Sequence, residues 1–156
     1  MKKALMILGG VFLILVVVVA AGIGVIAIKG RALDRESKQY VDSAIPAIVA
    51  QWNEGEISRR ASPEFKAAVG DDDLKKLLTM FRRLGKLSRY NGSEGQANMS
   101  VTTAHGKVIS AAYVAKADFE TGPAEIKLSL IKHGDQWQIL GIHVNSRVFL
   151  QPQRVS

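Results

Sequence analysis

The first 28 residues and the rest of the chain follow different hydrophobic patterns. Residues 4–28 contain no charged, amide or hydroxyl side chain and include an unbroken apolar run from Val11 to Val19. As a helix, this segment would be about 37 Å long, which exceeds the ~30 Å hydrocarbon core of a bilayer. Only a helix satisfies all of its own backbone hydrogen bonds at that depth. We therefore predict a transmembrane helix at residues 4–28, after a short tail at residues 1–3.

A cleaved secretory signal is the alternative interpretation of the same segment. Lys2 and Lys3 give it a basic start, and Val19-Ala20-Ala21 offers small residues for cleavage. The apolar part of a cleaved signal usually has roughly 7–15 residues, whereas this one continues to Ile28. The length favours an uncleaved signal anchor over a cleaved signal on a soluble, secreted ligand-binding protein.

The charges around the segment do not decide its orientation, because basic residues lie on both sides of it. They are Lys2 and Lys3 before it, and Lys29, Arg31, Arg35 and Lys38 after it. A three-residue tail before a long apolar run resembles a bacterial signal anchor. This resemblance implies a single-pass protein of the bacterial inner membrane, with residues 29–156 outside the cytoplasm.

After a linker at residues 29–33, helical spacing of apolar residues predicts two helices in the first part of the soluble domain. The first runs from Asp34 to Trp52, with a kink expected at Pro46. Asn53-Glu54-Gly55 is expected to end it. The second runs from Ser62 to Val69, with Ser62 as its N-cap and a proline in its first turn.

A third predicted helix, from Asp71 to Leu87, has one apolar and one basic face. Its apolar face consists of Leu74, Leu77, Leu78, Phe81 and Leu84. Its basic face consists of Lys75, Lys76, Arg82, Arg83 and Lys86. These cations could bind anionic lipid or an acidic protein partner, or simply form the solvated face of an amphipathic helix. Without interleaved aromatic residues or a docking motif, they do not predict nucleic-acid binding.

Beyond Leu87 the pattern changes from helical to alternating, which predicts strands. The five predicted strands are Ser88–Gly95, Gln96–Ala104, Val108–Glu120, Ala124–His133 and Gln136–Phe149. Tight turns between neighbours predict an antiparallel meander. Helices followed by a run of strands indicate an α+β domain, with three helices packed on one curved antiparallel sheet.

The chain resembles the nuclear-transport-factor-2-like (cystatin-like) superfamily over residues 34–149, leaving a tail at residues 150–156. The resemblance depends on the order of elements, on Trp52 at the end of the first helix, and on two motifs, Ala61-Ser62-Pro63-Glu64-Phe65 and Gly134-Asp135-Gln136-Trp137. It implies a cone-shaped sheet around the first helix with a pocket at the open end. Members include isomerases, dehydratases, assembly factors and membrane-tethered domains, so the fold alone does not define a function.

The candidate catalytic residues are few, and no catalytic role carries over from the superfamily. By alternation His143 shares a face with Ile139, and Asp118 follows a similar logic on another strand, so the two could line one pocket and transfer protons. The alternative is that Ile142 and Val144 face the core and His143 is exposed. No metal or cofactor is predicted, because no ligand set with suitable spacing or glycine-rich phosphate loop is present. Zero cysteines exclude thiol chemistry and disulfides.

The net charge of +7 does not single out a partner. The anchor, the basic face of the third helix and the missing catalytic motif favour a non-enzymatic, membrane-anchored binding module of the bacterial envelope. The alternative is a small pocket enzyme of isomerase or dehydratase type. Because sheets of this superfamily often pair face to face, a homodimer is a third hypothesis.

Overall fold

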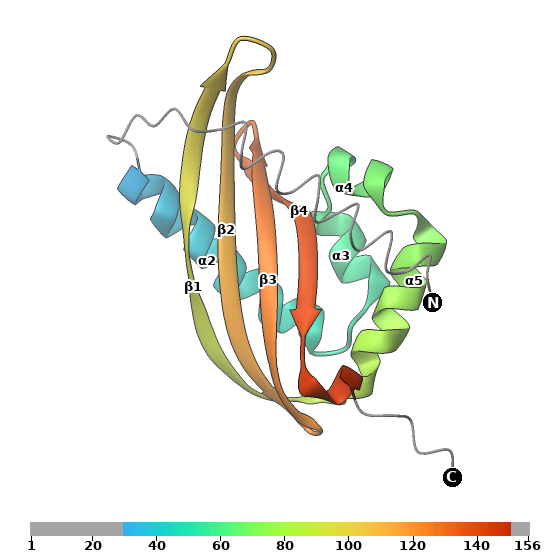
Figure 1. The fold of residues 1–156 in the computed structure, drawn as a ribbon. Helices are drawn as coiled ribbons and strands as arrows, with labels where there is room; N and C mark the ends of the chain where they lie inside the picture. Colours follow the sequence, from blue (N-terminus) through green and yellow to red (C-terminus); the bar gives the residue numbers. More distant parts are fainter. Residues whose placement is uncertain (1–29, 151–156) are drawn as a thin grey trace.

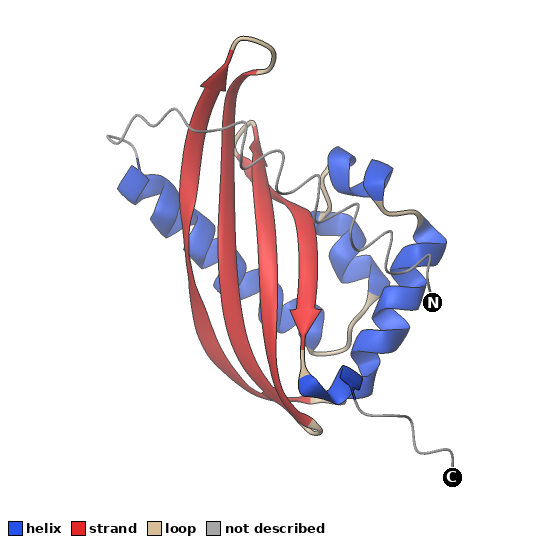
Figure 2. Cartoon of the chain, viewed as in Figure 1, coloured by secondary structure: helices blue, strands red, loops and turns tan. Residues whose placement is uncertain are grey.

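The computed structural model describes residues 30–150, which fold into helices and one antiparallel sheet (Figures 1 and 2). The helices come first: α2 (Gly30–Val49), α3 (Glu54–Arg60), α4 (Pro63–Ala68), α5 (Asp71–Phe81) and the 3-10 helix η1 (Arg82–Leu84). The strands β1 (Leu87–Thr102), β2 (Gly106–Phe119), β3 (Gly122–His133) and β4 (Gln136–Asn145) follow, and η2 (Arg147–Leu150) ends the described chain. The predicted α+β class is confirmed.

The predicted transmembrane segment at residues 4–28 lies outside the described residues. Within residues 30–150, no helix combines the length and the apolar composition needed to cross a bilayer.

The sheet is a simple meander in the order β1-β2-β3-β4, and every neighbouring pair is antiparallel. It is curved, and α2 packs across one face, which we call the inner face (Figure 1). The helices α3, α4 and α5 lie beyond β4, at the edge of the sheet farthest from β1 (Figure 1). The arrangement leaves the opposite, outer face of the sheet without a helix among the described residues.

The sheet has four strands where the sequence predicted five, because β1 continues through Gly95. Gly95 pairs with Tyr113 on β2. A Cβ atom at this position would lie 2.0 Å from the carbonyl oxygen of Ala112 and 2.7 Å from the Cα of Tyr113. The glycine therefore permits a close approach of two strands and does not end either of them.

The helical half also differs from the prediction in number and bounds. The helix α2 begins at Gly30, so residues 30–33, expected as part of a linker, are helical. Asn53 does not simply follow a helix end but begins the extra helix α3, where its side-chain oxygen accepts a hydrogen bond from the Gly55 backbone N–H (2.7 Å). The predicted cap of α4 is confirmed, since the Ser62 hydroxyl accepts from the Phe65 N–H (3.1 Å).

A continuous apolar core fills the space between the inner face and the helices. Leu74, Leu78, Phe81 and Leu84 are buried as predicted, and Leu77 is partly buried. At the end of α2 the Trp52 ring contacts Phe81 and Phe119, with ring centroids 5.1 and 6.0 Å apart. The other fully buried large side chains are Tyr113, Ile45, Ile48, Ile57, Ile126, Leu128, Leu130, Ile139 and Val41.

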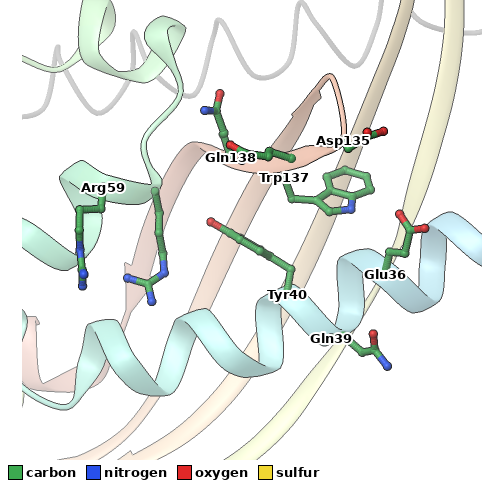
Figure 3. A pocket seen from close by; sticks show the side chains of 9 residues that line it. Glu36, Gln39, Tyr40, Arg59, Asp135, Trp137 and Gln138 are labelled. Atoms are coloured by element: carbon green, nitrogen blue, oxygen red, sulfur yellow. The ribbon is translucent and has the colours of Figure 1, made fainter.

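Polar contacts fix the rotation of α2 against the sheet. The Ser37 and Tyr113 hydroxyls lie 2.7 Å apart, and the Tyr113 hydroxyl also donates to the Asp34 carbonyl (3.0 Å). The Asp34 carboxylate accepts from the Ala97 N–H on β1 (2.7 Å). With Asp34 and Ser37 held against β1 and β2, other residues of the same helix turns, including Glu36 and Tyr40, lie near the start of β4 (Figure 3).

Candidate functional site

The structure does not bring the two candidate catalytic residues together. Leu130 pairs with Ile139 whereas Ser129 pairs with Gly141, so Leu140 is an extra residue in β4. This irregularity shifts the alternation by one residue. As a result Val144 is buried, and His143 is exposed on the outer face opposite Lys127. Neighbouring atoms of the sheet surface partly desolvate the His143 imidazole, and this effect, followed by the charge of Lys127, lowers its pKa.

Asp118 also lies on the outer face, on β2, where it accepts a hydrogen bond from the Asn91 side chain (3.1 Å). It pairs with Pro123 of β3, whereas His143 pairs with Lys127 of the same strand. The two side chains are therefore separated by two strand spacings across the sheet and four residues along it, which is more than 10 Å.

The predicted basic face of the third helix is spread over α5, η1 and the start of β1. Lys75, Lys76 and Lys86 are exposed, and Lys76 lies 3.8 Å from Asp73. Arg82 donates to the Trp52 carbonyl (3.1 Å) and so helps to close the end of α2, while Arg83 is partly buried. The exposed lysines keep the charge that an anionic surface would require.

The most distinctive site is a groove of about 590 Å³ between α2, α3 and the start of β4 (Figure 3). We call it the edge groove, because β4 is an edge strand of the sheet. Its lining residues are Glu36, Gln39, Tyr40, Arg59, Arg60, Asp135, Gln136, Trp137 and Gln138. Tyr40 and Trp137 lie between Arg59 at one end and Glu36 and Asp135 at the other (Figure 3). Its volume falls in the range of small-ligand sites.

Local sequence explains why α3 forms one wall of this groove. Asn53 caps the helix and Glu56 lies in its first turn, where the helix dipole favours a carboxylate. Arg59 and Arg60 lie in the last turn, where a cation is favoured. Directly after the helix, the Ser62 N–H donates to the Ile139 carbonyl (2.9 Å) and fixes this part of the chain to β4.

The α3 end of the groove is basic. Arg59 and Arg60 both pair with the single carboxylate of Glu56, which leaves an excess of one positive charge. The hydrogen bond from Arg60, followed by the charges of both arginines, outweighs burial and lowers the pKa of Glu56. Burial raises the pKa of the Tyr40 hydroxyl, and the charge of Arg60 partly offsets that effect. Tyr40 is therefore a neutral hydroxyl beside a cation at neutral pH.

The opposite end of the groove is acidic. Glu36 pairs with Lys132 (2.8 Å), whose hydrogen bond and charge lower the pKa of the Glu36 carboxyl. The Lys132 ammonium also lies 5.5 Å from the centre of the Trp137 ring. Trp137 contributes weakly to the lowered pKa of Glu36, although the two side chains do not meet the geometry of a hydrogen bond. Asp135 adds a second carboxyl group at this end.

The groove also gathers polar atoms without partners. Among the described residues, four buried side-chain polar atoms lack a hydrogen bond. Three of them, the Tyr40 hydroxyl, the Trp137 indole N–H and the Gln138 side-chain oxygen, belong to residues that line the groove. Leaving such a group unpaired costs about 1–3 kcal/mol. Such a concentration of unpaired buried groups is uncommon in folded proteins, and it is explained if the groove takes up a water molecule, an ion or a polar ligand group.

A second, smaller hollow of about 310 Å³ lies beside the irregular part of β1, and two of its lining residues, Lys38 and Ser93, belong to a hydrogen-bonded network. Asp42 on α2 accepts hydrogen bonds from Tyr90 (2.7 Å), Ser93 (2.6 Å) and Lys38 (2.8 Å). Burial and the adjacent Asp42 raise the pKa of Tyr90. This network holds β1 against α2, so we assign it a structural role.

The Asp42 network predicts a pH-dependent contribution to stability. Burial alone would raise the pKa of Asp42, but hydrogen bonds from Lys38, Ser93 and Tyr90 outweigh it and lower the pKa below the ordinary 3.8. Because the folded-state pKa is lowered, the stabilisation is complete above about pH 4 and disappears as the pH falls through the folded pKa.

We expect Asp42→Asn to reduce the free energy of unfolding by about 1 kcal/mol at pH 7, with a difference from the unsubstituted chain that shrinks below about pH 4. Urea titrations between pH 3 and pH 7 measure this difference. Asp118→Asn is the control, since Asp118 accepts a single hydrogen bond from Asn91 on the outer face. An Asp42→Asn difference that stays constant with pH would contradict the assignment.

The edge groove does not follow from the sequence pattern. Asn53-Glu54-Gly55 is predicted to end a helix, and this prediction hides the two arginines of α3. The spacing of Asn53 and Glu56 matches a helix-capping pattern and could have revealed the helix. Nothing in the local sequence indicates that Tyr40 and Trp137, which are far apart in the chain, line one groove.

Comparison of the chain with protein-family models, with curated proteins and with solved structures gave no match.

Proposed function

We propose that the chain is a single-pass, membrane-anchored, non-enzymatic binding module of the bacterial envelope, and that the edge groove is its binding site. The observation that carries the binding role is the clustering of three unpaired polar atoms on residues of one groove. These atoms are buried in the chain alone, so a partner would pair with them once the groove side chains move, and it would then recover hydrogen bonds that the folded chain does not make.

The tether is supported by the sequence of residues 4–28 and by the position of α2. The apolar segment ends at Ile28, and α2 begins at Gly30. Tyr40 lies ten residues farther along α2, which is about 15 Å of helix. If the segment spans the bilayer, the edge groove lies close to the membrane surface, within reach of other membrane-bound proteins. The exposed lysines Lys75, Lys76 and Lys86 would favour an anionic surface nearby.

The helix-then-meander order also supports membership of the nuclear-transport-factor-2-like superfamily, whose membrane-tethered members fit this role. A pocket enzyme of isomerase or dehydratase type is the alternative, but neither of its two candidate catalytic residues lines the edge groove. His143 and Asp118 lie on the outer face, well separated from each other. The homodimer, which the resemblance to the superfamily suggests, stays a hypothesis.

Site-specific photo-crosslinking in intact membranes tests the binding role. Gln39 is exposed and lines the edge groove, so a benzophenone amino acid at this position should crosslink to a bound partner. The same substitution at Lys127, which is exposed on the outer face, is the matched control. We expect a discrete product from position 39 that disappears in Arg60→Ala. The product should persist in Arg89→Ala, since Arg89 is exposed on β1 and pairs with Asp118 of the outer face. Equal products from both positions, or a product unaffected by Arg60→Ala, would contradict the proposal.

A further inference from the structure

We infer that the edge groove takes the carboxyl-terminal end of an extended peptide, held by main-chain hydrogen bonds to β4 and by Arg59 and Arg60. The inference deepens the proposed binding function and depends on it. Its evidence is the geometry of the β4 edge, the covered part of that edge and the charges at the two ends of the groove.

The peptide would form its main-chain hydrogen bonds with Trp137. In a strand, the N–H and C=O of one residue point to the same side, and the side alternates along the chain. The Ile139 carbonyl accepts from the Ser62 N–H, so the main-chain groups of Ile139 point away from β3. Trp137, two residues earlier in a regular stretch of β4, must therefore direct its N–H and C=O away from β3 as well. That direction is the edge groove, which Trp137 lines.

The free part of the β4 edge limits the length of the peptide. At Ile139 this edge is covered, because Ala61 forms a parallel bridge with Ile139 and the Ser62 N–H donates to the Ile139 carbonyl. On the other side, the turn at Gly134 and Asp135 ends the strand. Between that turn and Ile139, only Trp137 remains free to pair, so a long added strand is excluded at this position and the end of a chain fits.

The charges at the two ends of the groove set the direction in which the peptide binds. The α3 end of the groove carries the positive excess of Arg59 and Arg60, whereas Glu36 and Asp135 lie at the other end (Figure 3). A terminal carboxylate is attracted to the first and repelled by the second. The peptide would then lie parallel to β4, as the chain at Ala61 already does beside Ile139. Tyr40 and Trp137, which lie between the two ends, would flank its last side chains (Figure 3).

The chain offers a direct readout, because it contains only two tryptophans. Full-length protein in detergent micelles, labelled with 5-fluorotryptophan, should give two fluorine NMR signals, which Trp137→Phe assigns. Trp52 is 1% exposed within the core and serves as the internal reference. The probes are a pool of N-acetylated random tetrapeptides with a free carboxylate, the same pool with amidated C-termini, and sodium acetate.

We expect the free-carboxylate pool to shift the Trp137 signal and leave Trp52 unchanged. Amidation should weaken the response at least about tenfold, because a charge-assisted pair is lost, and acetate should have no effect at the same concentration. Arg60→Gln should remove the response, whereas Arg89→Gln, on the outer face, should not.

A silent Trp137 signal, equal responses to both pools, or a full response to acetate would each overturn the peptide assignment. A groove-dependent crosslink at position 39 together with a silent Trp137 signal would remove the peptide assignment and retain the binding function. If neither the crosslink at position 39 nor the shift of the Trp137 signal is observed, both the peptide assignment and the binding function are wrong.

Discussion

Gly95→Ala should destabilise the domain by about 3 kcal/mol or more, because a methyl group at this position collides with main-chain atoms. The added Cβ would lie 2.0 Å from the Ala112 carbonyl oxygen and 2.7 Å from the Tyr113 Cα. Neither atom can move unless β1 and β2 separate, and Tyr113 anchors the buried contact with Ser37. Urea titration of the detergent-solubilised full chain, followed by tryptophan fluorescence, measures the loss.

Gly30→Ala is the matched control, since a Cβ atom there meets no atom of the other described residues within 4 Å. Its effect should stay within about 0.5 kcal/mol. If Gly95→Ala were as mild as Gly30→Ala, the close approach of β1 and β2 at Gly95 would be wrong.

Trp52→Ala should cost about 3–5 kcal/mol, the usual range for removing a large buried aromatic side chain. Trp52 is 1% exposed and joins three parts of the fold, because its ring contacts Phe81 of α5 and Phe119 of β2 at the end of α2. The cavity left behind would loosen the packing of the helices against the sheet. The same urea titration gives the difference in the free energy of unfolding.

Trp52→Phe separates this packing role from the polar part of the side chain. The Trp52 indole N–H has no hydrogen-bond partner among the described residues, so losing it removes no bond. Phenylalanine keeps much of the aromatic packing, and we expect a loss below about 1.5 kcal/mol. A loss equal to that of Trp52→Ala would show that the core contacts of the ring are not the source of its effect.

The sequence predicts the architecture well where one local pattern dominates. The apolar spacing from Leu74 to Leu84 and the cap at Ser62 both predicted the observed helices. The sequence does not predict the structure correctly where a long-range contact determines the conformation. The sequence predicts a break between strands at Gly95, because glycine commonly ends strands, whereas in the structure it permits two strands to approach closely. That reason becomes visible only once Ala112 and Tyr113 are placed beside it.

The candidate site was harder to predict for the same physical reason. The extra residue at Leu140 reverses the side to which His143 points, and β-strand alternation alone cannot reveal such an irregularity. The edge groove combines residues of α2, α3 and β4. Each looks like an ordinary packing or surface residue within its own segment, and only the tertiary fold makes Tyr40 and Trp137 neighbours of the same groove.

The proposed function requires that the chain keeps residues 4–28, since this segment would hold the edge groove beside a membrane. The most direct test is the intact mass of the chain after alkaline extraction of the cells that express it. We predict that the chain stays in the membrane pellet with all 156 residues. Recovery from the soluble fraction of a chain that lacks its first two dozen residues would contradict the tether, and with it the proposed function.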